Sequence, residues 1–142
     1  MDIHEMYRLI EGTIKTEFMG AGVVFVTKSG KVLILKKPKG PWGMPGGKPA
    51  YGELPEEAAL RETYEETGIK VEDVSKPIVI YYRGKKYYSF FKLIDKKIDI
   101  QLSKEHKNYK WVPYDELKNI KLIPPIKENL DLYLKEIKRH LY

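Results

Sequence analysis

The sequence predicts an α/β fold in which helices cover a mixed β-sheet. Runs of β-branched and aromatic residues lie on both sides of a helical segment at residues 55–67, and a second helical stripe ends the chain. Strands that flank a central helix, with another helix at the end, are expected to form a sheet covered by helices. The chain has 142 residues, 42% of them hydrophobic, so residues 1–142 are predicted to form a single domain with its own core.

Six short segments are predicted to be strands because they are β-rich and bounded by turn residues. They are residues 23–27, 32–35, 78–82, 87–93, 98–102 and 110–112. The connections at 28–31 and 83–86 each contain a glycine, so the strands that they join are predicted to form hairpins. Residues 36–52 are dense in glycine and proline and are predicted to form a loop.

The central helix is predicted to span residues 55–67. Pro55 suits the first turn of a helix, and Gly68 suits the position after its end. Leu54 is a poor N-cap, so the preceding loop or a ligand has to satisfy the first backbone amides. A further short helix is predicted at residues 114–119.

The C-terminal stretch is predicted to be an amphipathic helix. Its apolar residues follow two prolines at helical spacing: Ile126, Leu130, Tyr133, Leu134, Ile137 and Leu141. Packing of this stripe against the core is preferred over the binding of a partner, because core packing is the usual role of such a stripe.

The composition excludes several classes of protein. The chain has no cysteine, which excludes disulfides, thiolate zinc sites and a cysteine nucleophile. It has no apolar run of about 20 residues that would span a bilayer, and residues 1–8 lack the apolar region of a secretory signal. These absences predict a protein of the cytoplasm with no membrane partner.

Acidic residues are concentrated in one short window of an otherwise basic chain. The net charge is +6, yet the window contains Glu53, Glu56, Glu57, Glu62, Glu65 and Glu66 against the single base Arg61. At about 100° per residue, Glu62, Glu65 and Glu66 share one arc of the helix about 100° wide. Like charges at this spacing repel, and a divalent cation would resolve the repulsion because it prefers carboxylate oxygens. A solvated charged face is the alternative.

The same angular positions around the helix assign its other sides. Leu60, Tyr64 and Thr67 fall opposite the acids and are predicted to face the core. Ala58 and Ala59 lie one turn earlier on the side of the acids, which leaves room above that surface. Arg61 is four residues before Glu65 and is expected to pair with it.

A glycine-rich loop precedes the acidic helix and favours a site over a merely solvated face. Residues 42–48 read Trp-Gly-Met-Pro-Gly-Gly-Lys, and Gly52 precedes Glu53. Small residues let backbone groups approach a ligand closely, and a helix N-terminus attracts anions. Loop and helix together predict a site for phosphate and metal, with Gly46, Gly47 and Lys48 as substrate-binding residues.

The spacing of these residues resembles the signature of the Nudix hydrolases. Five residues separate Gly47 from Glu53, seven more separate Glu53 from Arg61, and residues 61–69 read Arg-Glu-Thr-Tyr-Glu-Glu-Thr-Gly-Ile. Every charged and glycine position of the box at residues 47–69 matches. Thr63 departs, because the family usually has an aliphatic residue there. Its predicted place on the flank of the helix makes this a question of packing rather than catalysis.

The resemblance implies an α/β/α sandwich that cleaves a nucleoside diphosphate linked to another moiety. Carried over by position, Glu65 and Glu66 would bind Mg²⁺ or Mn²⁺. Glu62 would bind the metal or help to activate the attacking water. The ions would neutralise the pyrophosphate and lower the pKa of bound water.

Two further roles follow from the same resemblance. Arg61 would orient a glutamate, with Glu53 as the candidate for a catalytic partner. Gly46 would offer its carbonyl oxygen to the metal. Many members of the family form dimers, and residues 1–18 are a candidate for a homodimer contact; residues 18–21 are alternatively the start of the sheet.

Residues 103–111 resemble a Glu-His-x-x-Tyr-x-Trp stretch of Nudix enzymes that act on dinucleoside polyphosphates or nucleoside triphosphates. Glu105 is a candidate metal ligand or general base, with a solvated loop acid as the alternative. His106 is expected to be structural or to contact a substrate phosphate, in preference to a catalytic role.

Four tyrosines flank the second predicted hairpin: Tyr81, Tyr82, Tyr87 and Tyr88. Alternation places the members of each adjacent pair on opposite faces of the sheet, so one of each pair is available to stack on a base. An adenine-stacking tyrosine resembles the diadenosine polyphosphate group, and Tyr87 or Tyr88 would serve. The proline typical of the ADP-ribose group is missing from residues 83–88.

Three functions are consistent with these features. The first is hydrolysis of dinucleoside polyphosphates, and the second is hydrolysis of ordinary or oxidised nucleoside triphosphates or of ADP-ribose. The third is a non-catalytic module that binds nucleotide or RNA through its basic surface. The intact acids argue against the third function. The expected partner is a small nucleotide substrate, with no stable nucleic-acid partner.

Overall fold

The computed structural model describes residues 3, 18–104, 106 and 108–142. Its sheet contains β1 (Phe18–Thr27), β2 (Lys31–Lys36), β3 (Trp42–Gly43), β4 (Gly46–Gly47), β5 (Ile78–Tyr82), β6 (Lys85–Ile94) and β7 (Asn108–Pro113). The order is β3-β2-β1-β6-β5, with β4 paired to β1 and β7 paired to β2. The β1–β6 pair is parallel and the other strand pairs are antiparallel. The sheet is therefore mixed, as predicted.

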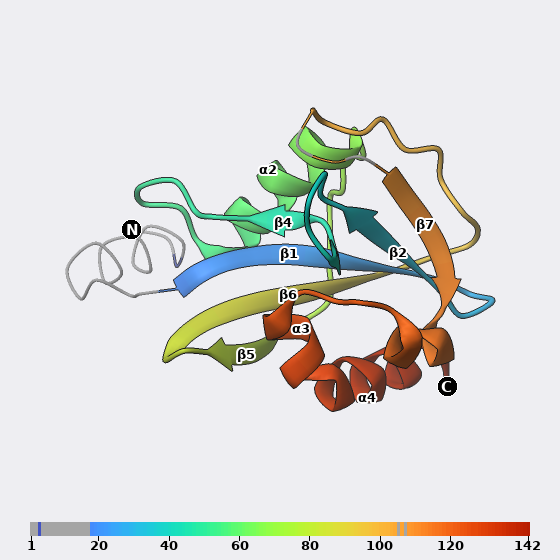
Figure 1. Cartoon of the computed structure of the whole chain (residues 1–142). Helices are drawn as coiled ribbons and strands as arrows, with labels where there is room; N and C mark the ends of the chain where they lie inside the picture. Colours follow the sequence, from blue (N-terminus) through green and yellow to red (C-terminus); the bar gives the residue numbers. More distant parts are fainter. Residues whose placement is uncertain (1–2, 4–17, 105, 107) are drawn as a thin grey trace.

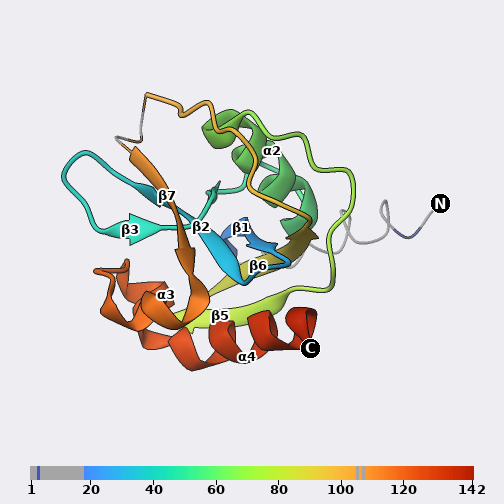
Figure 2. The same cartoon turned by 90° about the vertical axis from the view of Figure 1, so that its right-hand side faces the viewer.

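Helices cover both faces of this sheet. One face carries α2 (Pro55–Thr67), and the other carries the 3₁₀ helix η1 (Tyr114–Asn119), α3 (Pro124–Glu128) and α4 (Leu130–Leu141) (Figures 1 and 2). The side chains of β1 alternate between these layers: Ala21, Val23 and Phe25 pack toward α2, while Val24 and Val26 pack toward α3 and α4. The predicted α/β architecture is confirmed.

The hairpins form where the sequence predicts them, and both connections are shorter than predicted, because β2 begins at Lys31 and β6 at Lys85. Arg83 and Gly84 alone connect β5 to β6, and both have positive φ angles, 50° and 77°. Such angles are typical of the two-residue turns that match the twist of paired strands. The predicted strand at residues 98–102 is wrong. That segment has no strand partner and lies beside the C-terminal end of α2, where the amide of Gln101 donates to the carbonyl of Thr67 over 2.9 Å.

The predicted loop at residues 36–52 contains two short strands that build the site. β2 pairs with β1 at Val32 and Val26. Farther along these two strands their partners change: β3 pairs with β2, and β4 pairs with β1 at Ala21 and Gly22. Residues 44–45 connect β3 to β4, and the carbonyl of Pro45 accepts a hydrogen bond from the amide of Val23. The loop is therefore held within the sheet.

Helix α2 has the predicted bounds. Gly68 ends it with φ 75°, and its amide donates to the carbonyl of Tyr64 over 2.8 Å. At the start, the side chain of Glu57 accepts a hydrogen bond from the amide of Leu54 over 3.0 Å, so a residue of the first turn compensates for the poor cap.

The predicted orientation of α2 is wrong for Tyr64, whereas Thr67 is buried and Leu60 packs against the core, as predicted. The buried residues of the helix are Ala58, Ala59, Thr63, Glu66 and Thr67. Tyr64 is 57% exposed, although the helical wheel predicts it in the core. Gly47 explains the difference, because a Cβ atom at Gly47 would overlap the carboxylate of Glu62. The glycines of β4 thus let the acidic side of the helix approach the sheet.

The C-terminal stripe packs against the core, as predicted, but it is divided between two helices. α3 and α4 meet at Asn129, whose side-chain amide donates to the carbonyl of Pro125 over 2.8 Å. Ile126, Tyr133 and Ile137 are buried against the sheet. The Tyr133 hydroxyl lies 2.6 Å from the Ser89 hydroxyl of β6. These contacts fix α4 on the sheet.

Two further predictions concern the N-terminal region and membranes. Most of residues 1–18, the candidate dimer contact, lies outside the described residues. The alternative that the sheet begins within residues 18–21 is confirmed, because β1 starts at Phe18. Within the described residues, no helix is both long and apolar enough to cross a bilayer.

Candidate active site

Arg61 is the centre of the charged surface of α2. Its Nε and Nη2 atoms donate to the two carboxylate oxygens of Glu53 over 2.8 and 2.9 Å, a bidentate pair. Its Nη1 atom donates to Glu62 over 3.0 Å and to Glu65 over 3.2 Å. Nη2 also donates to the carbonyl of Lys48 over 3.0 Å. The expected pairing of Arg61 with Glu53 and with Glu65 is therefore present.

The Arg61–Glu53 pair sets the charge of Glu53. Hydrogen bonds from the guanidinium lower the pKa of the Glu53 carboxyl below its ordinary value, although partial burial acts in the opposite direction. The amide of Ala50 also donates to Glu53, over 2.6 Å. Glu53 raises the pKa of Arg61 in return. Both groups are consequently charged at neutral pH.

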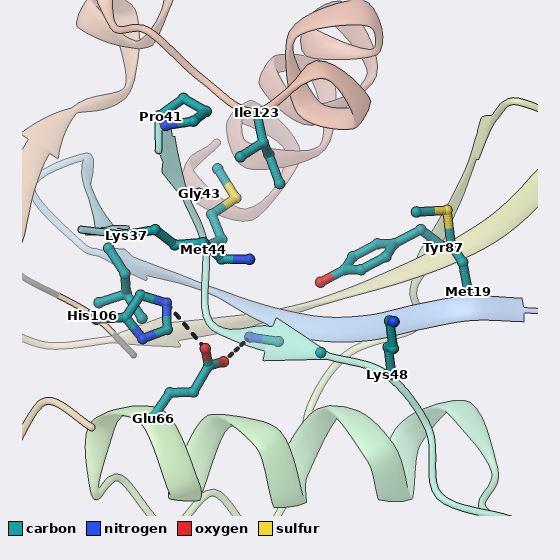
Figure 3. Close-up of a pocket in the computed structure, with 13 residues that line it drawn as sticks. Met19, Lys37, Pro41, Gly43, Met44, Lys48, Glu66, Tyr87, His106 and Ile123 are labelled. Carbon is teal, nitrogen blue, oxygen red and sulfur yellow. Dashed lines mark hydrogen bonds and ion pairs between the residues drawn. The ribbon is translucent and has the colours of Figure 1, made fainter. Parts of the chain in front are cut away.

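Glu66 is buried beneath the glycine-rich segment, with only 4% of its surface exposed. One carboxylate oxygen accepts a hydrogen bond from the amide of Gly46 over 2.6 Å. The other lies 3.1 Å from Nε2 of His106, and both contacts are drawn in Figure 3. Nδ1 of His106 lies 3.3 Å from the Ser103 hydroxyl. A buried carboxylate is costly unless it is paired, and Glu66 has such partners.

The three glutamates of the predicted metal site divide between two directions. Glu62 and Glu65 meet at the Nη1 atom of Arg61, whereas Glu66 points toward β4 and His106. In the described part of the chain, no three acidic or histidine side chains converge as a metal-ligand group. The predicted convergence of all three carboxylates is therefore not seen, because Arg61 contacts Glu62 and Glu65 while the amide of Gly46 and the His106 ring contact Glu66.

The donor set nevertheless fits a hard divalent cation. Glu62 and Glu65 contact a single positively charged group, the Arg61 guanidinium, so one cation can reach both carboxylates. All the side-chain donors are carboxylate oxygens, the type that Mg²⁺ and Mn²⁺ prefer. Gly46 contributes its amide to Glu66 in this structure, and the role predicted for its carbonyl stays a prediction.

A cavity of about 190 Å³ adjoins Glu66. It is lined by Met19, Leu35, Lys37, Pro41, Gly43, Met44, Gly46, Gly47, Lys48, Glu66, Tyr87, His106 and Ile123. The lining combines apolar side chains with two lysines, and the Tyr87 hydroxyl points into the cavity (Figure 3). Pockets that hold whole drug-sized ligands begin at about 300 Å³, so this cavity suits one part of a ligand, such as a nucleobase.

The Tyr87 ring lies against a floor of glycines. A Cβ atom built at Gly20 would come within 2.8 Å of the ring, and one at Gly22 within 2.7 Å of the hydroxyl. A Cβ atom at Gly46 would overlap the hydroxyl. Alternating glycines in a strand signal such close approach, and the glycines at positions 20 and 22 are the sequence feature that could have revealed this contact.

Burial is the main reason why the pKa of the Tyr87 phenol is raised well above its ordinary value. Tyr133 and the negative carboxylates of Glu66 and Glu62 raise it further. The Tyr87 phenol therefore stays protonated at neutral pH and can donate a hydrogen bond into the cavity.

The remaining predicted residues differ in their relation to the cavity. Tyr88 packs on the α2 side of the sheet, edge-on to Phe18 with ring centroids 5.6 Å apart, and does not line the cavity. Glu105 lies outside the described residues. Sequence reasoning missed Met44 and Ile123, which line the cavity from positions far apart in the chain. No local pattern at Ile123 signals this role.

A family model described as the NUDIX domain matches residues 17–133. A Bis(5'-nucleosyl)-tetraphosphatase [asymmetrical] of Rattus norvegicus is 38% identical over 87 residues, which cover 53% of this chain and 57% of the relative. A putative 8-oxo-dGTP diphosphatase of Bacillus subtilis is 42% identical over 67 residues, covering 46% of this chain and 44% of the relative. The chain thus spans about half the length of these two relatives.

Solved structures agree with the family model. A binary complex of an Ap4A hydrolase from C. elegans superimposes with a TM-score of 0.72 at 26% sequence identity. The superposition covers 86% of this chain and 97% of the C. elegans chain. Since the family model matches residues 17–133, which make up most of the chain, the chain belongs to the Nudix family.

Proposed function

We propose that the chain is a hydrolase that cleaves a pyrophosphate bond in a nucleoside diphosphate-linked substrate with the help of Mg²⁺ or Mn²⁺. The observation that supports this most is the position of Glu66, which lies between the charged surface of α2 and a cavity of the size of a nucleobase. The base would occupy the cavity while the phosphates lie along the glutamates.

The glutamates of α2 would hold the cation. Glu62, Glu65 and Glu66 are the candidate ligands, with the carbonyl of Gly46 and the side chain of Glu105 as additional candidates. Divalent cations at such a site neutralise the charge of a pyrophosphate and lower the pKa of bound water.

The residues around the carboxylates would orient the substrate and move its protons. Arg61 holds Glu53 ionised and positions the loop through the carbonyl of Lys48. Either Glu62 or Glu105 would accept the proton of the attacking water, because a carboxylate close to the phosphates is suited to general base catalysis. Gly47 lets the Glu62 carboxylate pack directly against β4, which keeps that carboxylate beside the glycine-rich segment.

The leading substrate class is the dinucleoside polyphosphates. The protonated hydroxyl and the ring of Tyr87, together with Met44 and Ile123, would contact one base, and Lys48 and His106 would contact phosphates. The rat and nematode relatives support this class by their names. The alternative is a nucleoside triphosphate, ordinary or oxidised, which the Bacillus relative supports. Both classes supply one base to the cavity.

A panel of nucleotides tests the proposal. The whole chain is incubated with Mg²⁺ and with diadenosine tetraphosphate, ATP, 8-oxo-dGTP or ADP-ribose, and the products are separated by chromatography. Formation of ATP and AMP from diadenosine tetraphosphate supports the leading class, whereas pyrophosphate from a triphosphate supports the alternative. Metal-independent binding of nucleotide or RNA, with no hydrolysis of any member of the panel, would contradict the enzymatic function.

A further inference from the structure

An extended segment of the chain is fixed to the C-terminal end of α2. The amide of Gln101 donates to the carbonyl of Thr67 over 2.9 Å, and the amide of Ser103 donates to the carbonyl of Glu66 over 3.1 Å. The amide of His106 donates in turn to the carbonyl of Ser103 over 3.2 Å. These hydrogen bonds keep His106 close to the last turn of the helix, where Glu66 lies.

His106 is buried against the side chain of the same glutamate. Its Nε2 atom lies 3.1 Å from the Oε2 atom of Glu66, and only 4% of the His106 side chain and 6% of the Glu66 side chain are exposed. Because an ionised carboxylate can only accept hydrogen bonds, Nε2 is the donor of this contact. The segment therefore holds Glu66 at two points, at its backbone carbonyl through Ser103 and at its carboxylate through His106.

The Glu66 carboxylate is also held from the opposite side. The amide of Gly46 donates to its Oε1 atom over 2.6 Å, so the carboxylate lies between His106 and β4 (Figure 3). Each oxygen of a carboxylate has two lone pairs, so each oxygen of Glu66 can accept one of these hydrogen bonds and still face a cation. A carboxylate that is already fixed loses little further conformational freedom when it binds a ligand, which strengthens binding.

The contacts of His106 favour this orienting role over a contact with phosphate. Both ring nitrogens have neighbours within the protein, since Nε2 meets Glu66 and Nδ1 lies 3.3 Å from the Ser103 hydroxyl. Lys37 and Lys48 line the same cavity and carry the positive charge that attracts phosphates. The cavity thus has other groups for the phosphates, whereas the His106 ring is directed at Glu66.

We propose that His106 is a positioning residue, which fixes the orientation of the Glu66 carboxylate for a divalent cation. The inference rests on the proposed function and gives His106 this role in place of the phosphate contact considered there. Residues that hydrogen-bond a metal ligand typically change metal affinity or activity by about 10–100-fold when they are replaced. Such a residue acts through Glu66 and need not touch the substrate.

Three substitutions of His106 separate the role of Nε2 from that of the rest of the ring. His106→Gln places an amide donor near the position of Nε2, whereas the shorter side chain of His106→Asn reaches only the position of Nδ1. The two variants are neutral amides of the same chemistry, so the glutamine variant is the matched control. His106→Leu has no donor and is the second loss variant. Thermal unfolding checks that each variant is folded.

A Mn²⁺ titration followed by electron paramagnetic resonance, without nucleotide, measures the effect on the cation. The asparagine and leucine variants should bind Mn²⁺ about tenfold more weakly than the wild-type chain, and His106→Gln should stay within about threefold of it. In a Glu66→Gln background, His106→Asn should add less than about twofold, because the residue acts through Glu66. Wild-type Mn²⁺ affinity in both loss variants, or a full additional loss in the Glu66→Gln background, would overturn the inference.

Steady-state kinetics distinguish positioning from a contact with the substrate. In His106→Asn the kcat for diadenosine tetraphosphate or ATP should fall about tenfold, while the KM should stay within about twofold of the wild-type value. A raised KM with unchanged Mn²⁺ affinity would assign His106 to a phosphate and would contradict the positioning role.

A measurement without metal or substrate separates this inference from the proposed hydrolysis. Hydrogen exchange followed by NMR reports on the amide of Gly46, which donates to Glu66. This amide should exchange about tenfold faster in His106→Asn and His106→Leu, because the carboxylate is no longer fixed, and at the wild-type rate in His106→Gln. That result supports the inference even if the wild-type protein cleaves no nucleotide, which would contradict only the proposed hydrolysis. Unchanged exchange in both loss variants would contradict the inference itself.

Discussion

Helices α2 and α4 cover opposite faces of one sheet and bury opposite kinds of side chain. α4 buries Tyr133 and Ile137. α2 buries two alanines along with the polar residues Thr63, Glu66 and Thr67. The small alanines and the glycines of β4 bring α2 close to the sheet, so its polar groups lie where a substrate can be held. The comparison indicates that α4 stabilises the fold, whereas α2 positions the polar residues proposed to act on the substrate.

The largest expected effect is the loss of activity on changing Glu66. Glu66→Gln retains the shape of the side chain but removes the charge proposed to hold the cation. We expect kcat to fall at least about 10³-fold, equivalent to about 4 kcal/mol in activation free energy, with the fold intact. Enzyme kinetics with saturating Mg²⁺ measure the fall in kcat, and circular dichroism checks that the fold is intact. Near-wild-type activity would refute the assignment of Glu66.

The control for Glu66 is another acid of the same helix. Glu56 is exposed in the first turn of α2, away from the cavity lining. Glu56→Gln removes one negative charge as Glu66→Gln does, so it should keep kcat within about twofold of the wild-type value if the loss depends on position.

On α4 the expected effect is on stability. Ile137 is fully buried, and Ile137→Ala should lower the free energy of unfolding by about 2–5 kcal/mol because it leaves a cavity in the core. Leu132 lies on the same helix but is 47% exposed, so Leu132→Ala should change it by less than about 1 kcal/mol. Urea unfolding measures both. If Ile137→Ala also lowered the kcat of the folded enzyme as strongly as Glu66→Gln, the division between the helices would be wrong.

The ion pair between Glu53 and Arg61 should make the stability of the fold depend on pH. Because Arg61 lowers its pKa in the folded state, ionised Glu53 stabilises the fold above its ordinary pKa of 4.5, and this stabilisation is lost as the pH falls through the lowered value. Glu53→Gln should therefore lower the free energy of unfolding by about 1–2 kcal/mol at pH 7 and by progressively less below pH 4.5. Urea unfolding across pH 3–7 checks the trend. A difference from wild type that stays constant over this range would contradict the role of the ion pair.

The smallest expected effect concerns the position where the signature departs. Among the described residues, Thr63 Oγ1 is a buried side-chain atom without a hydrogen-bond partner. Thr63→Val should raise the free energy of unfolding by about 1 kcal/mol. Thr67 is the matched control, because its hydroxyl donates to the carbonyl of Thr63 over 2.7 Å and accepts from the amide of Ile69. Thr67→Val should therefore lower stability, and the reverse order in thermal unfolding would contradict this account.

Local signals predicted most of the fold. The bounds of α2 follow from Pro55 at its first turn and Gly68 after its end, and the α4 stripe follows from apolar spacing. The error at residues 98–102 has a nonlocal cause. Their alternation is typical of a strand, but the amides of Gln101 and Ser103 bond to the end of α2. The last carbonyl groups of a helix lack partners within the helix, so an extended segment can donate its amides to them instead of pairing with a strand.

The site was predicted by residue type more fully than by geometry. The spacing of Arg61 and the glutamates identified which residues gather there. The same spacing could not show that Tyr64 is exposed, because the side that α2 presents to the sheet depends on the missing side chain at Gly47. It also could not show His106 against Glu66, since that contact joins segments far apart in the sequence.

The central claim is that the carboxylates of α2 hold a divalent cation, and a Mn²⁺ titration followed by electron paramagnetic resonance tests it most directly. We predict saturable binding to the wild-type chain and to Glu56→Gln, and binding at least about tenfold weaker to Glu66→Gln. Equal Mn²⁺ affinity in all three proteins, or no saturable binding to the wild-type chain in the presence of nucleotide, would contradict the claim.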